Sequence, residues 1–281
     1  MAPSAETHSR IAPWQRITDR FLRTTSAPLT LSLTRRAVVV VPCYNEAERL
    51  RPETFLAAVQ EHPALQFLFV DDGSRDGTAR VLDTLVARKP ESLSCLKLST
   101  NRGKAEAVRL GIREAFKRSP ELVGFLDADL STPISELPSM AEAFDDPEIL
   151  VVLGSRVALL GREIRRSNRR HYLGRVFATL ASMTLGLRVY DTQCGAKLFR
   201  VTDSIRRIFD REFLSSWAFD VELLARLRQM ERAQRIQPVA RTVVEVPLRQ
   251  WTDIRGSKIG LGDSFIATLQ LLHIWWRYRA D

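Results

Sequence analysis

Between residues 37 and 126, four short apolar runs alternate with three segments that have helical spacing of their apolar residues. The first run, 37–41, is entirely apolar and mostly β-branched, which is typical of a strand buried on both faces. Strands that alternate with helices at this spacing predict an α/β fold with a mainly parallel sheet. We expect strands over 37–41, 66–70, 93–98 and 122–126, and helices over 46–61, 78–88 and 105–118.

A polar cluster follows each of these four strands. The clusters are Asn45-Glu46, Asp71-Asp72, 101–104 and 127–129. The carboxyl ends of parallel strands meet at one edge of a sheet, and ligands of α/β proteins bind in the crevice there. The sequence therefore predicts that all four clusters line one crevice.

The clusters contain residue types that suit a phosphorylated ligand. Asp127 and Asp129, at i and i+2, provide carboxylates for a hard divalent cation that would bridge nucleotide phosphates. Asp71 or Asp72 can accept a hydrogen bond from a base or a ribose hydroxyl, and Lys104 at a helix start suits phosphate. The alternatives are a solvated turn or helix cap for the first pair, an N-capping turn for the second, and a solvated basic turn for Lys104.

Beyond residue 150 we expect strands over 151–153 and 242–246 and helices over 176–187 and 218–228. We also expect a terminal amphipathic helix over 260–279. Residues 1–36 resemble a leader, partly helical, without the apolar core of a signal peptide. The nearest candidate for a membrane span, 265–276, is too short to cross a bilayer, but it could lie on one. The predicted division is a leader (1–36), a domain with a donor half (37–135) and an acceptor half (136–250), and a closing loop with an interfacial helix (251–281).

The charge balance narrows the class of partner. The 281 residues carry a net charge of +9, which favours anionic partners. Six arginines fall within 162–175, and as part of a helix Arg165 and Arg169 would share one face, as would Arg166 and Arg170. This cluster suits a phosphate, anionic lipid heads or both, or is a solvated basic face; no nucleic-acid recognition motif accompanies it. The three cysteines form no CxxC pair, which argues against structural zinc and disulfides and favours a cytosolic location.

Four motifs in the first half of the chain resemble those of a known enzyme family. They are VPCYNE (41–46), VDDGSRDGT (70–78), NRGK (101–104) and DAD (127–129). In order and spacing they resemble glycosyltransferase family 2, above all its dolichyl-phosphate β-glucosyltransferase and polyprenyl-phosphate branch. The resemblance implies a GT-A fold with Mg²⁺ or Mn²⁺ on Asp127 and Asp129, although Ser131 stands where mannosyl-transferring relatives often have Gln. The implied nucleotide-binding residues are Pro42, Tyr44, Glu46, Asp71, Asp72, Lys104 and Asp127.

The second half adds weaker matches: GSR (154–156), DTQCGAKLF (191–199), WAFDVE (217–222), and Trp251 with GSK (256–258). They imply that Asp191, Arg156, Asp220 and Lys258 are catalytic. The candidates for the acceptor phosphate or the membrane are Arg156, Arg165, Arg166, Arg169, Arg170, Gln193, Trp251, Ser257 and Lys258.

The resemblance implies inverting transfer of a hexose, glucose from UDP-glucose, to a polyprenyl or dolichyl phosphate. The enzyme would sit peripherally on the cytoplasmic face of an anionic membrane. A phosphomonoester acceptor needs no general base, because its second pKa is about 6. A second hypothesis is a hydroxyl acceptor, for which Asp191 or Asp220 would serve as the base. A third is a nucleotide-sugar or membrane-binding module without catalysis.

Overall fold

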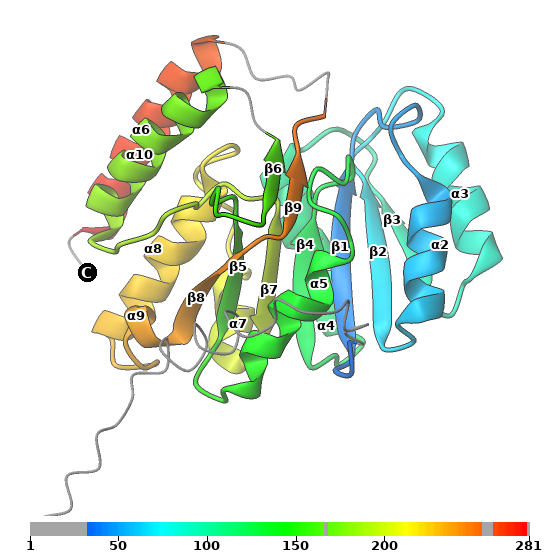
Figure 1. Cartoon of the computed structure of the whole chain (residues 1–281), viewed down its shortest axis with the longest axis horizontal. Helices are drawn as coiled ribbons and strands as arrows, with labels where there is room; N and C mark the ends of the chain where they lie inside the picture. Colours follow the sequence, from blue (N-terminus) through cyan, green and yellow to red (C-terminus); the bar gives the residue numbers. More distant parts are fainter. Residues whose placement is uncertain (1–32, 166–167, 255–260, 280–281) are drawn as a thin grey trace, which may run out of the picture. The chain divides into compact units, whose positions relative to one another are not determined.

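The computed structural model describes residues 33–165, 168–254 and 261–279, all within one compact unit. Its centre is a seven-stranded sheet with the order β3-β2-β1-β4-β7-β5-β8 (Figure 1). The neighbours in this sheet pair in parallel, except that β7 runs antiparallel to both β4 and β5. The predicted α/β fold with a mainly parallel sheet is confirmed. The strands are β1 (Ala37–Cys43), β2 (Leu65–Asp71), β3 (Leu93–Lys97), β4 (Leu122–Leu126), β5 (Val151–Ser155), β7 (Ala196–Arg200) and β8 (Val243–Pro247).

Two predicted helices have different limits. The helix expected over 46–61 begins only at Pro52, where the fixed φ of proline suits the first turn, and a turn closed by the Leu50 N–H to Glu46 O bond precedes it. The helix expected over 176–187 begins at Asn168. The helices are α2 (Pro52–Glu61), α3 (Thr78–Arg88), α4 (Lys104–Phe116), α5 (Glu136–Ala141), α6 (Asn168–Leu185), α7 (Asp203–Ile208), α8 (Phe219–Arg232), α9 (Val239–Thr242) and α10 (Leu261–Tyr278), with a 3₁₀ turn η1 (Glu142–Asp145).

The alternation of side chains along the strands builds a core on each face of the sheet. On one face, Phe55 of α2 packs edge-on against Phe67 and Phe69 of β2, with ring centroids 5.0 Å apart in both pairs. The residues between them point the other way, so that Leu68 and Val70 join α4 and α8 in the larger core. Helices on both faces leave the strand ends as the polar edge of the sheet.

Strand β7 was not predicted. Its residues are nearly all buried, but Lys197 interrupts the apolar run that would have revealed it. Because β7 runs backwards between β4 and β5, its first residue lies at the carboxyl ends of its neighbours, with Ala196 opposite Leu126. The segment that precedes β7 therefore reaches the same edge as the segments that follow the parallel strands.

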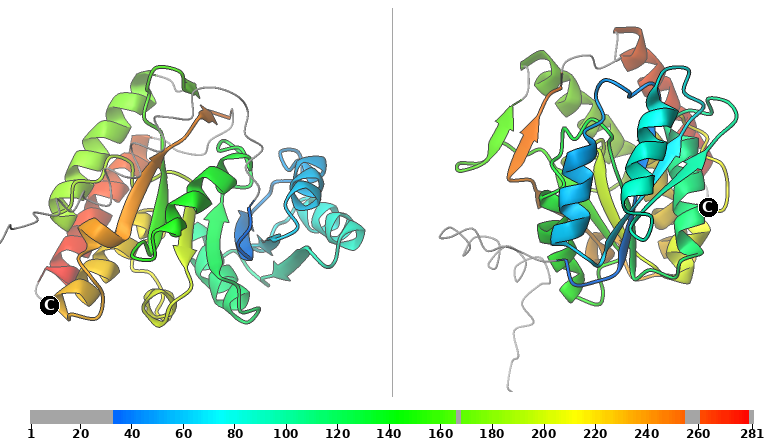
Figure 2. Two further views of the ribbon diagram at one scale, coloured as in Figure 1. Left: turned by 60° about the horizontal axis from the view of Figure 1, so that its bottom comes forward. Right: turned by 90° about the vertical axis from the view of Figure 1, so that its right-hand side faces the viewer.

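A two-stranded parallel ribbon, β6 (Glu163–Arg165) with β9 (Gln250–Thr252), stands apart from the main sheet (Figure 2). Arg165 belongs to β6, so the prediction that Arg165 and Arg169 share a helical face is wrong. Helices α6 and α10 lie side by side in both figures. No helix in the described ranges is long and apolar enough to cross a membrane.

The expected amphipathic pattern of the terminal helix is not confirmed. In the described part of α10, Leu271 and Ile274 are buried against the core, whereas Leu272 and Trp276 are exposed. Apolar side chains therefore lie on both the inner and the outer face of this helix.

Candidate active site

The loops after β1 and β2 are tied together at the polar edge. The Glu46 N–H donates to Thr78 Oγ1 at 2.8 Å, and the Asn45 N–H donates to Ser74 Oγ at 3.0 Å. Asn45 has a φ of +53°, which its short polar side chain tolerates better than most residues. Tyr44 is half-buried and Glu46 is buried on this loop, and Asp71, at the end of the neighbouring strand β2, is buried as well. The predicted nucleotide-binding residues of the first two motifs thus lie on adjoining loops.

Asp72 holds the third motif in place. Its two carboxylate oxygens accept hydrogen bonds from the Arg102 and Gly103 N–H groups, at 2.7 and 2.8 Å. Burial raises the pKa of Asp72, and these two hydrogen bonds oppose the shift. With both oxygens committed to the backbone, Asp72 positions the start of α4 and the Lys104 side chain that follows.

Lys104 joins the third motif to the fourth. Its Nζ lies 2.5 Å from Asp127 Oδ1, and both side chains are partly exposed. Burial works to lower the pKa of Lys104, but the negative charges of Asp127 and Asp220 outweigh it, so that the pKa is raised. The ammonium group is therefore charged at neutral pH and directed into the crevice.

The acidic pair has the donor set of a divalent cation that is shared with a diphosphate. Asp129 Oδ1 accepts hydrogen bonds from the N–H and hydroxyl of Ser131, at 2.9 and 2.8 Å. Within the described ranges, no hydrogen bond reaches its Oδ2, and no three His, Cys, Asp or Glu side chains gather as a metal cluster. Mg²⁺ is typically bound by one or two carboxylates, and substrate phosphates and waters provide its remaining ligands. Asp127 and Asp129 fit that role, with Lys104 as the present counter-charge of Asp127.

Gly195 makes room for the acidic pair. The Asp127 N–H donates to Gly195 O at 3.0 Å, which brings the two backbones together. A Cβ placed on Gly195 would lie 2.1 Å from Asp127 Oδ2, far inside van der Waals contact. Glycine is therefore required by a close approach, a role that the sequence motif alone did not assign.

Beneath Asp127 lies a buried ion pair that sequence reasoning missed. Lys197 Nζ is 2.8 Å from Asp220 Oδ1 and donates to Cys194 O at 2.7 Å, and both side chains are almost fully buried. Burial raises the pKa of Asp220, and the positive charges of Lys197 and Lys104 oppose the shift. The signal was a lysine inside an otherwise apolar strand.

Arg156 and Asp191 form a second buried pair. Asp191 Oδ2 accepts from Arg156 Nε at 2.6 Å and Asp191 Oδ1 from its Nη2 at 2.7 Å, so the contact is bidentate. Burial works to raise the pKa of Asp191, but Arg156 outweighs it and the pKa is lowered. Glu245 accepts from the Tyr190 and Asp191 N–H groups, both at 2.7 Å, and so fixes this turn. Asp191 is therefore a weak base that is already saturated by a guanidinium.

The β9 segment closes over this pair. The Trp251 ring centroid lies 5.3 Å from Arg156 Cζ, and the Thr252 N–H donates to Ser131 O at 3.0 Å. The buried Glu136 carboxylate accepts from the backbone N–H groups at 249 and 250, which anchors the segment.

The remaining predicted residues are placed less completely. Gln193 lies beside Asp191, and its buried Nε2 has no hydrogen-bond partner in the described part of the chain. Arg165 is exposed and ion-paired with Glu163. Arg166, Ser257 and Lys258 lie outside the described residues, as do the side chains of Arg169 and Arg170.

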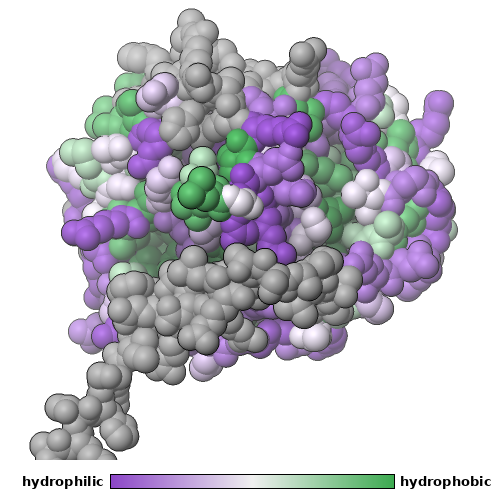
Figure 3. All heavy atoms as spheres, viewed as in Figure 1, coloured by the Kyte–Doolittle hydropathy of each residue, from purple (hydrophilic) through white to green (hydrophobic). Residues whose placement is uncertain are grey.

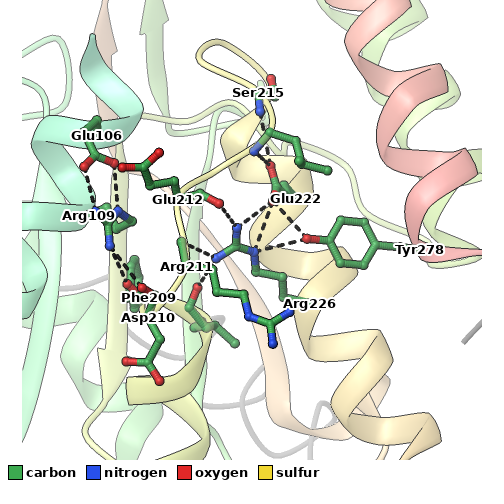
Figure 4. Close-up of polar contacts among 12 residues, drawn as sticks. Glu106, Arg109, Phe209, Asp210, Arg211, Glu212, Ser215, Glu222, Arg226 and Tyr278 are labelled. Carbon is green, nitrogen blue, oxygen red and sulfur yellow. Dashed lines mark hydrogen bonds and ion pairs between the residues drawn. The ribbon is translucent and has the colours of Figure 1, made fainter. Parts of the chain in front are cut away.

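A network of buried charges supports the segment that leads to Asp220 (Figure 4). Arg226 of α8 donates to the carbonyl oxygens of Ile208, Arg211 and Glu212, and pairs with Glu222 at 2.7 Å. Arg109 of α4 donates to the carbonyl oxygens at 209 and 210. These contacts fix the chain between α7 and α8, at the end of which Asp220 enters the site.

The chain is similar to known proteins in sequence and in fold. The family model described as Glycosyl transferase family 2 matches residues 38–207. A dolichyl-phosphate beta-glucosyltransferase of Trichomonas vaginalis is 32% identical, over 86% of this chain and 71% of that protein. The human dolichyl-phosphate beta-glucosyltransferase is also 32% identical, over 81% and 71%. The fold is similar to that of glucosyl-3-phosphoglycerate synthase from Mycobacterium tuberculosis in complex with Mn²⁺, UDP-glucose and phosphoglyceric acid, with 18% identity, a TM-score of 0.58, and coverage of 86% and 80%.

Proposed function

Because the chain belongs to glycosyltransferase family 2, we propose that it transfers glucose, with inversion, from UDP-glucose to a dolichyl or other polyprenyl phosphate. The acceptor is supported by the names of its relatives, which are dolichyl-phosphate beta-glucosyltransferases. The donor and the cation are supported by the UDP-glucose and Mn²⁺ in the glucosyl-3-phosphoglycerate synthase complex. In this proposal 37–135 is the donor half of the domain and 136–250 is the acceptor half.

In the donor half, Pro42, Tyr44, Glu46 and Asp71 are proposed to line the nucleoside pocket. Asp72 has a positioning role, because its oxygens are committed to the loop that carries Lys104. Lys104 is the group closest to the acidic pair that can turn toward donor phosphates, since it is partly exposed and charged.

Asp127 and Asp129 are proposed to hold Mg²⁺ or Mn²⁺. When bound, such a cation supplies charge neutralisation for the departing nucleoside diphosphate. The carboxylates must keep their close spacing for this, and Gly195 and Ser131 hold them there. Lys104 pairs with Asp127 and carries a positive charge, so its ammonium is proposed to contact the donor phosphates as well.

The observation that carries the acceptor assignment is the pair of Arg156 with Asp191. A hydroxyl acceptor needs a base, yet both oxygens of Asp191 accept from Arg156 and its pKa is lowered. A phosphate acceptor is already anionic and needs cations and hydrogen-bond donors instead. Arg156 and the unpartnered Nε2 of Gln193 are proposed to receive it, under the Trp251 ring. Five further residues, whose side chains the structure does not describe, are also proposed to bind the acceptor phosphate or the membrane. They are Arg166, Arg169, Arg170, Ser257 and Lys258.

The membrane contact is proposed to be the outer face of the α6–α10 pair. Residues 172, 176, 180 and 183 fall on one face of α6, and 269, 272 and 276 do so on α10. Figure 3 shows hydrophobic side chains among hydrophilic ones on the side where these helices lie in Figure 1. An exposed apolar stripe beside cationic residues suits a peripheral position at an anionic interface. The exposed residues are Tyr172, Val176, Leu180, Met183, Leu269, Leu272, Trp275 and Trp276.

The experiment that tests the function is a panel of nucleotide sugars with detergent-solubilised polyprenyl phosphate and Mn²⁺ or Mg²⁺, read by mass spectrometry. We expect a hexosyl phosphate lipid with UDP-glucose, of β configuration, and no product after chelation. If no nucleotide sugar in the panel labels the lipid phosphate, the proposal is wrong.

One observation favours a second candidate, a hydroxyl acceptor with Asp220 as general base. Burial raises the pKa of Asp220, which is the direction that a base requires. Against this candidate, Asp220 already forms an ion pair with Lys197, with 2.8 Å between Nζ and Oδ1, and this positive charge opposes the uptake of a proton. An Asp220→Asn variant that loses transfer to a hydroxyl acceptor, but keeps UDP binding and transfer to a lipid phosphate, would support the second candidate.

A further inference from the structure

A cavity of about 300 Å³ lies between the last turns of α6, α8 and α10. Figure 1 shows α6 running away from β6, so the cavity lies at the far end of this helix from the ribbon that adjoins the candidate active site. None of the residues assigned to donor, metal or acceptor lines it. The cavity therefore needs an explanation separate from the transfer reaction.

The polar part of the lining is cationic. Arg228, Arg232 and Arg279 line the cavity, and no acidic side chain is among its described lining residues. The nearest carboxylate contact is that of Glu231, which pairs with Arg228 Nη1 at 2.6 Å. Arg228 Nε is buried and has no hydrogen-bond partner within the described ranges. A buried donor without a partner is costly. The Nη2 atom of the same guanidinium lies beside the cavity wall, since a Cβ built on the lining residue Gly186 would stand 3.9 Å from it.

The rim of the cavity is apolar and exposed. Met183 of α6 and Trp275 of α10 line it, and their exposed fractions are 73% and 42%. The Arg279 guanidinium lies 4.5 Å from the centroid of the Trp275 ring. Cationic groups beneath an apolar and aromatic rim have the polarity of the boundary between a lipid headgroup and its acyl chains.

The wall of the cavity is fixed in place. Tyr278 contributes its ring to the lining, while its hydroxyl donates to Glu222 Oε1 at 2.9 Å within the network of Figure 4. Arg232 Nη1 donates to Tyr278 O at 2.8 Å, which links α8 to the end of α10. Arg228 therefore lines a space between helices that are anchored to one another, as a preformed site requires.

We propose that this cavity binds a phosphate group, and that its apolar rim selects phosphate carried on a lipid over free phosphate. Guanidinium groups recognise phosphate oxygens through paired N–H donors, which gives Arg228 the central role. The site refines the membrane contact of the proposed function, on which the choice of a lipid source rests. Its test measures binding alone, so that failure of glycosyl transfer would leave it unaffected.

The first experiment is co-sedimentation of the full chain with phosphatidylcholine vesicles that contain or lack phosphatidic acid. Arg228→Gln and Arg279→Gln remove cavity cations, and Arg277→Gln is the matched control, since it removes the same charge from the exposed end of α10 outside the lining. We expect Arg228→Gln to weaken binding to phosphatidic acid vesicles about tenfold and Arg277→Gln about twofold. Equal losses in the two variants would mean a diffuse charge effect and would overturn the proposal.

The second experiment separates the two sources of phosphate by titration calorimetry, with inorganic phosphate and with monomeric short-chain phosphatidic acid. Tighter binding of the lipid, lost in Arg228→Gln and Arg279→Gln but kept in Arg277→Gln, is the expected result. Equal affinity for both compounds overturns the preference for lipid, and binding of neither overturns the site. Unchanged thermal unfolding of the variants ensures that a loss reflects the cavity rather than the fold.

Discussion

The Cα of Gly195 packs against the carboxylate of Asp127 so closely that a Cβ at position 195 would lie 2.1 Å from Oδ2. Gly195→Ala must therefore displace Asp127. We expect transfer to fall about 10²-fold or more, as when a group that stabilises the transition state is lost. The control is Gly77→Ala, whose Cβ would meet Ala47 Cβ at an ordinary 3.6 Å. Initial rates and thermal unfolding would check both variants, and an active Gly195→Ala enzyme would contradict the assigned role of Asp127.

Removal of Asp129 tests the proposed cation site. Asp129→Asn keeps the hydrogen-bonding shape but lowers the charge, so we expect weaker Mn²⁺ binding, measured by electron paramagnetic resonance, and at least a 10²-fold loss of rate. Glu114→Gln is the control, because Glu114 lies near the other end of α4 and pairs there with Lys117 at 2.6 Å. If Mn²⁺ binds both variants as it binds the parent, the cation is held elsewhere.

The pair of Arg156 with Asp191 predicts a pH-dependent stability. Asp191→Asn leaves a buried guanidinium without its counter-charge, which costs about 3–5 kcal/mol of unfolding free energy at neutral pH. Because the pKa of folded Asp191 is lowered, the unfolded chain takes up its proton first as the pH falls below about 4. The stability that Asp191 contributes is therefore fully present above that pH and is lost as the pH falls through the folded pKa.

Denaturant titrations from pH 7 to pH 2 would measure this difference. The difference in unfolding free energy between the parent and Asp191→Asn should become smaller below about pH 4. Asp83→Asn, which breaks the exposed pair of Asp83 with Lys97, should leave the unfolding free energy nearly unchanged, because solvent screens such a pair. A gap that stays constant over the whole range would show that the carboxylate of Asp191 is not stabilised by Arg156.

Lys104 is predicted to act on the donor rather than on the fold. Lys104→Met removes the partly exposed ammonium beside Asp127 and should weaken UDP binding about tenfold to a hundredfold, since a charge-assisted contact to phosphate contributes roughly 1.5–3 kcal/mol. Lys117→Met, at the exposed residue that caps the carboxyl end of the same helix, should leave UDP binding unchanged. Calorimetry with UDP measures both, and equal affinity in the two variants would remove Lys104 from the donor site.

Much of the donor half could be predicted from the sequence because its strands are short apolar runs with polar ends. The expected strand over 122–126 and the helix over 78–88 have the limits of β4 and α3. The convergence of Asp127 with Lys104 followed from parallel topology alone. Local sequence patterns were sufficient to predict the parts of the fold that consist of one strand, the loop after it and the next helix.

The other contacts depend on groups that are distant in the sequence. Lys197 reads as a surface residue until Asp220 and Cys194 O surround it. Asp72 reads as part of a nucleotide motif, but its oxygens are satisfied by the next loop. The bidentate contact of Asp191 with Arg156 spans 35 residues and decides whether Asp191 can act as a base. Burial and pairing of this kind arise only from the tertiary arrangement.

The packing of β7 in the core fixes the register that places Lys197 next to Asp220. Side chains alternate along a strand, so a slip of β7 by one residue would turn Lys197 away from Asp220 and place an aliphatic side chain under the acidic pair. The same slip would turn Leu198 and Phe199 to the opposite faces of the sheet, so that each would lose its present packing. A chain with the wrong register therefore loses packing energy even without substrate. Smaller side chains at positions 198 and 199 should lower the rate of transfer, although no polar group of the crevice is changed.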